Sequence, residues 1–282
     1  MNIAPVRSFN YPKQIFKNDT AATIKRLQNN IYVSFKGNNL SDKISLIPSN
    51  APDNLEKNIE NKLGINFADT TTSKFKDGEI YTNIKDKVRN KDVYIMPGAS
   101  SNVNDNIMEV FLKTDAAKRA GAKKVVAIMP YFSYSRQEKK MEAGEPIAAK
   151  LHMDLLERSG VDEIITTDLH SPAIEGFSSN NLIVNHINAA DIIKDYIKQM
   201  EIPDLVIVSP DSGGMKRADR LAVSLGNVGT AGIYKNRTAH NVAEAKFLAG
   251  DVKDKNCIIY DDIIDTAGTI AAAANMLKEN GA

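Results

Sequence analysis

The sequence has little that would mark a secreted, membrane or nucleic-acid-binding protein. Its single cysteine, Cys257, excludes an intramolecular disulfide and fits a reducing compartment. Its 36 basic and 35 acidic residues leave a net charge of +1, so no overall field attracts nucleic acid or an anionic membrane. No apolar run approaches the length that crosses a bilayer, and the N-terminal segment lacks the apolar stretch of a signal peptide. These absences predict a cytoplasmic protein in which any anion site is local.

Apolar segments of strand length alternate with helical periodicity from about Ile44 to the end of the chain. Most of these segments are apolar on both faces, which is typical of parallel sheets covered by helices. With 282 residues and 43% hydrophobic side chains, the chain can form two modest domains. The sequence therefore predicts an α/β fold with mainly parallel central sheets flanked by helices. The expected strands begin at Ile44, Asp92, Lys124, Glu163, Leu205 and Asn256.

Apolar residues at helical spacing separate these strands in four places. One expected helix begins near Pro146 and ends at Gly160, two residue types that favour those positions. Its apolar residues are Ile147, Leu151 and Leu155. The other three helices are marked by Ile107, Val110 and Phe111, by Ile193, Tyr196, Ile197 and Met200, and by Met215, Ala218, Ala222 and Leu225.

Two parts of the chain echo one another. The units that begin at Asp92 and at Asp204 each consist of an expected strand, a glycine-containing turn and a helix. We therefore expect an N-terminal domain over residues 43–187 and a C-terminal domain over residues 188–282 that lacks its last segments. Residues 1–42 precede this pattern as an extension to which the sequence assigns no role.

The segment YDDIIDTAGT, residues 260–269, has the composition of a loop that binds a phosphorylated sugar. Small residues and hydroxyl groups before a helix let backbone N–H groups face a phosphate at the positive helix end. Asp261 and Asp262, at the end of an apolar strand, can accept hydrogen bonds from vicinal ribose hydroxyls. An Asp-Thr pair alone would only cap a helix, but the whole segment after a strand favours a phosphate loop.

Two further turns follow expected strands, where the ligands of open α/β sheets gather. Asp211 lies in SPDSGG after the strand at Leu205, and His170 lies in DLHSP after the strand at Glu163. A lone histidine is more often structural than a ligand, so either turn has a purely structural interpretation as well. Their positions make both residues candidates for a binding site.

Other charged residues suit a polyphosphate or a base. Lys235 and Arg237 alternate along an extended segment, so both would project from one face and stabilise charge that grows during transfer. Arg136 and Gln137 follow aromatic residues and are suited to contacts with a base or a phosphate. Ordinary surface loops would show the same patterns. The segment FKDGE, residues 75–79, by itself predicts only a tight turn around its glycine.

Taken in order, these segments resemble the ribose-phosphate pyrophosphokinase family over roughly Ile44 to Ala282. The phosphate loop is shared in type with phosphoribosyltransferases, so it indicates the ligand and not the reaction. The reaction is indicated by FKDGE, NVNDNIME, YSRQ, DLHSP, SPDSGG and KNRTAHNVAE. The resemblance implies two phosphoribosyltransferase-like domains. It also implies transfer of the β,γ-diphosphoryl group of Mg-ATP to the anomeric hydroxyl of ribose 5-phosphate, which gives phosphoribosyl pyrophosphate and AMP.

The resemblance also implies a role for each motif. Lys235 and Arg237 match the mobile catalytic pair of the family. On the nucleotide side, Arg136, Gln137 and His170 match residues that hold ATP, with Phe75, Asp77 and Glu79 supplied by a neighbouring subunit. On the sugar side, Asp261 and Asp262 match residues that hold ribose, and its 5-phosphate lies against Asp265, Thr266, Ala267, Gly268 and Thr269.

His170 and Asp211 match the positions that hold the magnesium nucleotide. Magnesium prefers oxygen ligands, so Asp211 is the better candidate for a direct or water-bridged ligand. The implied partners are ATP, ribose 5-phosphate and further copies of the chain, in a homo-oligomer built from dimers and up to a hexamer. Neither nucleic acid nor a membrane is expected as a partner.

Two other functions stay open at this point. The loop at Asp261 alone also fits a phosphoribosyltransferase that consumes phosphoribosyl pyrophosphate. The unusual start and end of the chain fit a catalytically weak homologue that regulates true synthetases. His170, Asp211, Lys235 and Arg237 are all present, and they favour an enzyme over the second alternative.

Overall fold

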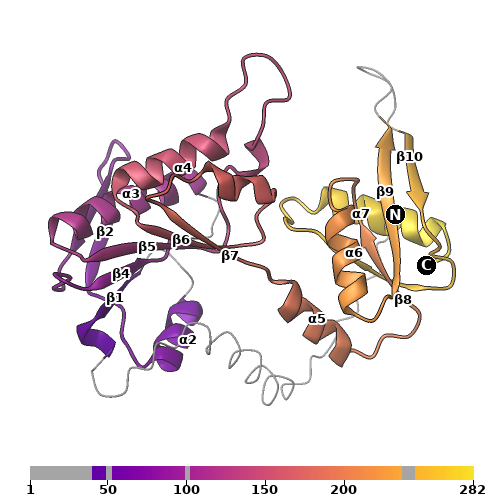
Figure 1. Ribbon diagram of the computed structural model, residues 1–282, viewed down its shortest axis with the longest axis horizontal. Coiled ribbons are helices and arrows are strands. Elements are labelled where there is room, and N and C mark those ends of the chain that lie inside the picture. Colours follow the sequence, from indigo (N-terminus) through magenta and orange to yellow (C-terminus); the bar gives the residue numbers. More distant parts are fainter. Residues whose placement is uncertain (1–39, 49–52, 99–101, 237–244) are drawn as a thin grey trace. The chain divides into compact units, whose positions relative to one another are not determined.

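Five parallel strands form the first sheet, in the order β1-β4-β5-β6-β7 (Figure 1). The computed structural model describes residues 40–48, 53–98, 102–236 and 245–282. Val93, Val125 and Ile164 are fully buried at the centre of this sheet, as expected where helices cover the faces. The strands are β1 (Ile44–Ile47), β4 (Asp92–Ile95), β5 (Lys124–Met129), β6 (Glu163–Thr167) and β7 (Ile183–Ile187).

Helices α3 (Val103–Arg119) and α4 (Ala148–Ser159) contribute to the core of this sheet. Val110 and Ala117 of α3, and Met153 and Leu156 of α4, belong to the same buried cluster as the sheet residues. A further helix, α2 (Asp53–Leu63), follows β1. Short 3-10 helices lie at η1 (Leu40–Asp42), η2 (Ser135–Gln137) and η3 (Pro172–Phe177).

Helix α4 is confirmed, but the apolar stripe that predicted it does not face the core. Leu151 and Leu155 are 56% and 44% exposed, whereas Met153 and Leu156 are fully buried. The helix ends at Gly160, whose φ of 108° lies in the left-handed region that favours glycine. Helical spacing reports that a helix forms, and on a helix with apolar residues on two sides it does not report which side packs.

The second sheet has the order β10-β9-β8-β11. The pairs β8·β9 and β8·β11 are parallel, and β9·β10 is antiparallel. Its strands are β8 (Leu205–Ser209), β9 (Gly229–Asn236), β10 (Ala245–Ala249) and β11 (Asn256–Ile259). Its helices are α5 (Ala190–Gln199), α6 (Met215–Ser224) and α7 (Gly268–Glu279).

Alternate residues of β8 face two separate cores. Ile207 packs with Leu221 of α6, and its neighbours Val206 and Val208 pack with Leu277 of α7. This alternation is what a strand covered on both faces requires. Cys257 is partly buried and packs against the second of these cores.

All six expected strands are confirmed, and the described residues contain five further strands that were not expected. Two of these, β2 (Thr70–Lys74) and β3 (Ile80–Ile84), form an antiparallel hairpin. The others are β7, β9 and β10. All five contain polar or small residues that hide a strand pattern. The units that begin at Asp92 and Asp204 form β4 with α3 and β8 with α6, so the strand, turn and helix expected in each are confirmed.

Residues 41–282 form one compact unit by their contacts. In the described part of the chain, no helix has the length and apolar character needed to cross a membrane.

Candidate active site

Three carboxylates follow two neighbouring strands of the second sheet. Asp211 comes after β8, and Asp261 and Asp262 come after β11. Because β8 and β11 are adjacent and parallel, these side chains share the carboxyl edge of the sheet. The sequence prediction that this edge collects functional residues is consistent with this placement.

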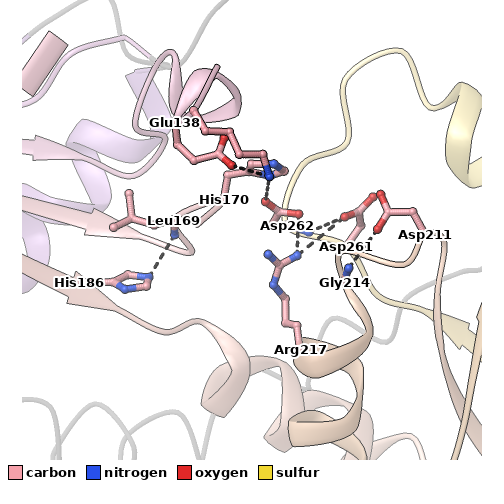
Figure 2. Close-up of polar contacts among 10 residues, drawn as sticks. Glu138, Leu169, His170, His186, Asp211, Gly214, Arg217, Asp261 and Asp262 are labelled. Atoms are coloured by element: carbon pink, nitrogen blue, oxygen red, sulfur yellow. Dashed lines mark hydrogen bonds and ion pairs between the residues drawn. The ribbon is translucent and has the colours of Figure 1, made fainter. Parts of the chain in front are cut away.

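The turn after β8 fixes Asp211 by two hydrogen bonds. Ser209 Oγ donates to the Asp211 carbonyl oxygen at 2.7 Å. The Gly214 N–H donates to Asp211 Oδ1 at 3.0 Å (Figure 2). A β-carbon at Gly214 would lie 2.5 Å from Ser209 Oγ, which is closer than real contacts allow. Glycine is therefore required at this position because the turn closes tightly around the serine.

Asp262 is held on both carboxylate oxygens. Arg217 Nη1, from α6, donates to Asp262 Oδ1 at 2.5 Å, and His170 Nδ1 lies 2.8 Å from Oδ2 (Figure 2). The Asp262 side chain is only 5% exposed. The second carboxylate, Asp261, lies 3.9 Å from the same Arg217 nitrogen. The arginine thus neutralises one member of the pair directly and the other only weakly.

The adjacent carboxylates have opposite pKa shifts. Burial alone would raise the pKa of Asp262, but hydrogen bonds from His170, Asp261 and Arg217 hold it well below its ordinary value. Burial raises the pKa of Asp261 to about 6, assisted by the neighbouring charges of Asp262 and Asp211. Asp262 is therefore a fixed negative charge, and Asp261 is a carboxylate whose cationic partner, Arg217, lies 3.9 Å away and is shared with Asp262.

His170 follows β6 of the first sheet. The preceding Asp168 has a φ of 42°, in the left-handed region that few residues other than glycine adopt. The hydrogen bond with Asp262 raises the pKa of the His170 imidazole above its ordinary value, and burial opposes the rise. The charged form of His170 is therefore favoured. Among the described residues, no hydrogen bond is seen to its other ring nitrogen, Nε2.

The expected phosphate loop leads into α7. Ala267 has a φ of 59° directly before Gly268, the first residue of the helix. Residues 265–269 are exposed. Arg136 Nη1 lies 3.3 Å from Asp265 Oδ2, in an ion pair whose side chains are both more than half exposed. Backbone N–H groups of a first helical turn have no partner within the helix, so they are free to bind an anion.

The FKDGE segment is the turn of the hairpin between β2 and β3. Phe75 N donates to Glu79 O at 2.8 Å, Glu79 N donates to Asp77 Oδ1 at 3.1 Å, and Gly78 has a φ of 98°. Phe75 is 56% exposed and stands edge-on to Tyr81, with ring centroids 6.1 Å apart. Among the described residues, this turn makes no hydrogen bond or ion pair to Asp211, Asp262 or His170.

The remaining expected site residues lie in η2 and β9. Arg136 and Gln137 are in η2, where Gln137 N donates to Tyr134 O at 2.9 Å. Lys235 is in β9, where its backbone faces Lys246 of β10. Arg237 lies outside the described residues. Neither residue of the expected catalytic pair can therefore be placed against the three carboxylates by a side-chain contact.

Comparisons with known proteins agree with this fold. The family model for the N-terminal domain of ribose phosphate pyrophosphokinase matches residues 44–160, and the phosphoribosyl transferase domain model matches residues 180–282. A ribose-phosphate pyrophosphokinase of Oceanobacillus iheyensis is 43% identical over 237 residues, which is 83% of this chain and 73% of that protein. The chain belongs to the ribose-phosphate pyrophosphokinase family.

Two other relatives of this chain give the same result. The ribose-phosphate pyrophosphokinase of Bacillus subtilis is 41% identical over 246 residues, which is 87% of this chain and 77% of the relative. The crystal structure of phosphoribosylpyrophosphate synthetase from Mycobacterium smegmatis matches with a TM-score of 0.79 and 38% identity. It covers 85% of this chain and 78% of the other. The family that the motifs indicated is confirmed, and the chain is an enzyme of this family.

Arg217 was not predicted from the sequence to be a site residue. It lies in the helix after SPDSGG, where one more basic residue in KRADR carries no distinct signal. Arg217 is distinguished by its hydrogen bond to Asp262, the carboxylate that follows β11. The two residues meet only because β8 and β11 are paired. A cation one helical turn after a ligand-binding loop is the signal that could have drawn attention to it.

Proposed function

We propose that this chain transfers the β,γ-diphosphoryl group of ATP to the anomeric hydroxyl of ribose 5-phosphate, with AMP as the leaving group. The supporting observation is the Asp262 carboxylate, which joins the sugar-side loop to His170 on the nucleotide side. A site for two phosphorylated substrates needs acceptors for sugar hydroxyls and donors for phosphates within one cluster. The hydroxyl attacks the β-phosphorus directly, so no protein nucleophile is required.

In this proposal the two carboxylates have different tasks. Asp262 is saturated by Arg217 and His170, so it acts as the anchor of the cluster. Asp261 has no comparable cationic partner among the described residues, and its charge is costly where it is. A hydroxyl donor offsets such a cost. Asp261 is therefore the carboxylate that accepts hydrogen bonds from the ribose hydroxyls.

The 5-phosphate of the sugar binds at the start of α7. Residues 265–269 are exposed and lead into the positive end of the helix. Asp265 now pairs with Arg136, so a phosphate that enters the loop competes with Asp265 for nearby donors. Loss of this ion pair would release Arg136 for the nucleotide, which is the role that the family resemblance assigns to it.

On the nucleotide side, His170 is better suited to a phosphate than to a metal. The hydrogen bond to Asp262 raises its pKa and favours the imidazolium, which has no lone pair to give to a cation. Its free N–H can instead donate to a phosphate oxygen. Gln137, next to Arg136 in η2, completes the polar contacts on this side.

Magnesium fits the carboxyl edge of the second sheet. Among residues 40–48, 53–98, 102–236 and 245–282, no three His, Cys, Asp or Glu side chains are grouped so as to hold a metal. Mg²⁺, however, is often held by one or two carboxylates together with substrate phosphates. Asp211 and Asp261 meet that need, because burial and neighbouring negative charge raise the pKa of Asp261 and a cation would relieve the repulsion. Bound there, Mg²⁺ would neutralise charge on the diphosphoryl group. Asp211 is the expected ligand.

Lys235 and Arg237 are proposed to stabilise the transferring group. β9 extends beyond its last pair with β8, which joins Ser209 to Gly232, so Lys235 lies past the carboxyl edge of the sheet. That is the side on which Asp211 and Asp261 lie. A cation there can meet charge that grows in the transition state.

The adenine pocket is proposed to need a second copy of the chain. Phe75 is more than half exposed, and the hairpin turn that carries it makes no polar contact to the carboxylate cluster within the described residues. A neighbouring subunit could therefore receive Phe75, Asp77 and Glu79. This arrangement would make the active site a property of a homo-oligomer.

The reaction is tested by its products. Protein, ribose 5-phosphate, Mg²⁺ and ATP labelled in the γ-phosphate should give unlabelled AMP and labelled phosphoribosyl pyrophosphate in equal amounts. ADP as the sole nucleotide product would contradict the proposal. Release of pyrophosphate that depends on an added base would instead favour a phosphoribosyltransferase.

A further inference from the structure

His186 binds the backbone of the loop that carries His170 (Figure 2). Its Nε2 lies 3.1 Å from Leu169 N and accepts that N–H. A ring nitrogen that accepts carries no proton, so the proton of the neutral ring is on Nδ1. Nδ1 lies 2.7 Å from Glu175 Oε1, and this carboxylate oxygen accepts the hydrogen bond from Nδ1–H. One imidazole thus links β7, the loop after β6 and η3.

The Leu169 amide needs such a partner because strand pairing ends just before it. The last paired residues of β6 and β7 are Thr167 and Ile187, and Asp168 N still donates to Ile187 O at 3.2 Å. Leu169 is the next residue, and it is 4% exposed. A buried N–H without an acceptor is costly, so the His186 ring substitutes for the acceptor that a continued ladder would supply.

The loop is also bent at the residue before Leu169. Asp168 has a φ of 42°, and its Oδ1 accepts the Ala189 N–H at 3.1 Å. A non-glycine residue keeps such a conformation only where its surroundings hold it. Ala189 thus holds the side chain of Asp168, and His186 holds the backbone N–H of Leu169, the residue directly before His170.

We propose that His186 is a positioning residue of the active site, which fixes the Leu169 backbone so that His170 is held in place for the nucleotide. The inference rests on the proposed function, in which His170 contacts the phosphates. Because His186 acts through the backbone of another residue, its loss should lower kcat and leave the KM for ribose 5-phosphate almost unchanged. Small displacements of a catalytic contact reduce rates by roughly 10- to 100-fold.

Three variants separate anchoring from general damage. His186→Phe keeps a ring but removes the acceptor. His186→Gln keeps an acceptor, because its amide oxygen can lie near the position of the histidine Nε2. Val184→Ala removes packing from the same strand, where Val184 borders the core, and leaves the bond to Leu169 untouched. We expect kcat to fall roughly tenfold or more in His186→Phe. It should recover to within about threefold in His186→Gln and stay near the starting value in Val184→Ala.

A double-mutant cycle tests whether His186 acts through His170. If it does, adding His186→Phe to His170→Ala should not reduce kcat further, because the contact that His186 positions is already gone. Multiplicative losses would overturn the inference. So would a His186→Phe enzyme with kcat within twofold of the original, or a folded His186→Gln enzyme that is no better than His186→Phe.

Hydrogen exchange gives a readout that does not need activity. In the full-length protein, the peptide that contains Leu169 should exchange faster in His186→Phe and at the original rate in His186→Gln. Unchanged exchange in His186→Phe would overturn the anchoring role whatever the enzyme makes. If exchange responds as expected but the original protein forms no phosphoribosyl pyrophosphate, the proposed function fails and the anchoring role stands.

Discussion

The regions around His152 and His170 give the same imidazole opposite properties. His152 is 2% exposed under η2, where its ring centroid lies 4.9 Å from that of Phe132. Burial lowers its pKa, so it is held neutral, with Nδ1 donating to Ser133 O at 3.0 Å. The His170 side chain is 39% exposed and pairs with Asp262, which raises its pKa. An apolar pocket makes one histidine a packing residue, and a carboxylate makes the other a charged group.

The difference between the two histidines arises from charged partners that lie in distant segments of the chain. His170 and Asp262 are 92 residues apart in the sequence, and Arg217 and Asp262 are 45 apart. The packing region around His152 tolerates a change of residue if shape is kept. The charged region does not, because each removed partner leaves another group buried without compensation.

The largest effect is expected at Asp261. Asp261→Asn should lower kcat/KM for ribose 5-phosphate by roughly 100-fold or more. A neutral amide accepts hydrogen bonds from the ribose hydroxyls less well, and it lacks the negative charge that would attract Mg²⁺. Steady-state rates of AMP formation measure the loss. Asp219→Asn, an exposed aspartate of α6, is the matched control and should keep its activity. Equal activity in both variants would remove Asp261 from the site.

Arg217 should matter for folding as well as for activity. Arg217→Met leaves the buried Asp262 carboxylate with His170 as its remaining described partner, which should cost about 1–3 kcal/mol of unfolding free energy. Urea unfolding without substrates measures this cost. Arg220→Met removes an exposed arginine from the same helix and should stay within about 0.5 kcal/mol of the original. If both variants unfold alike, the ion pair with Asp262 contributes no stability.

His152 should make stability depend on pH. Its folded pKa is lowered, so the unfolded state binds the proton more readily, and stability is lost as the pH falls through the unfolded value near 6.5. Between pH 7 and pH 5 this loss is at most about 2 kcal/mol. In His152→Phe the loss should shrink by that amount, as measured by urea unfolding at both pH values. An unchanged pH dependence would mean that the ring charges as easily in the folded protein.

The smallest effect on stability is expected at Phe75. Phe75→Ala should leave the unfolding free energy within about 0.5 kcal/mol, since the ring is 56% exposed, yet raise the KM for ATP. Val223→Ala, at a residue that is 63% exposed, controls for loss of surface apolar area.

Co-expression then tests whether Phe75 serves a neighbouring subunit. Mixed oligomers of Phe75→Ala and Asp261→Asn chains would combine an intact hairpin from one chain with an intact carboxylate site from the other. Activity above that of either variant alone would support a shared site. Activity that is only the average of the two would place Phe75 within its own chain's site.

The sequence alone determined most of the sheet strands and the family. Strands such as β5 and β8 are apolar on both faces, and that pattern survives any arrangement of the rest. The prediction of a phosphate loop from Tyr260 to Thr269 is likewise local, because the strand end, the small residues and the helix start are contiguous. The domain division at residue 187 and the roles of Lys235 and Arg237 stay predictions.

Only the tertiary structure decided which side of α4 is buried, which carboxylate is neutralised, and how the His170 loop is held. Leu151 and Met153 are both apolar, and only the neighbouring sheet selects Met153 for the core. Asp261 and Asp262 are adjacent and identical, and Arg217 and His170 make them different. Such distinctions arise from contacts between residues far apart in the chain. Charge, burial and hydrogen bonding depend on those contacts, and no local pattern encodes them.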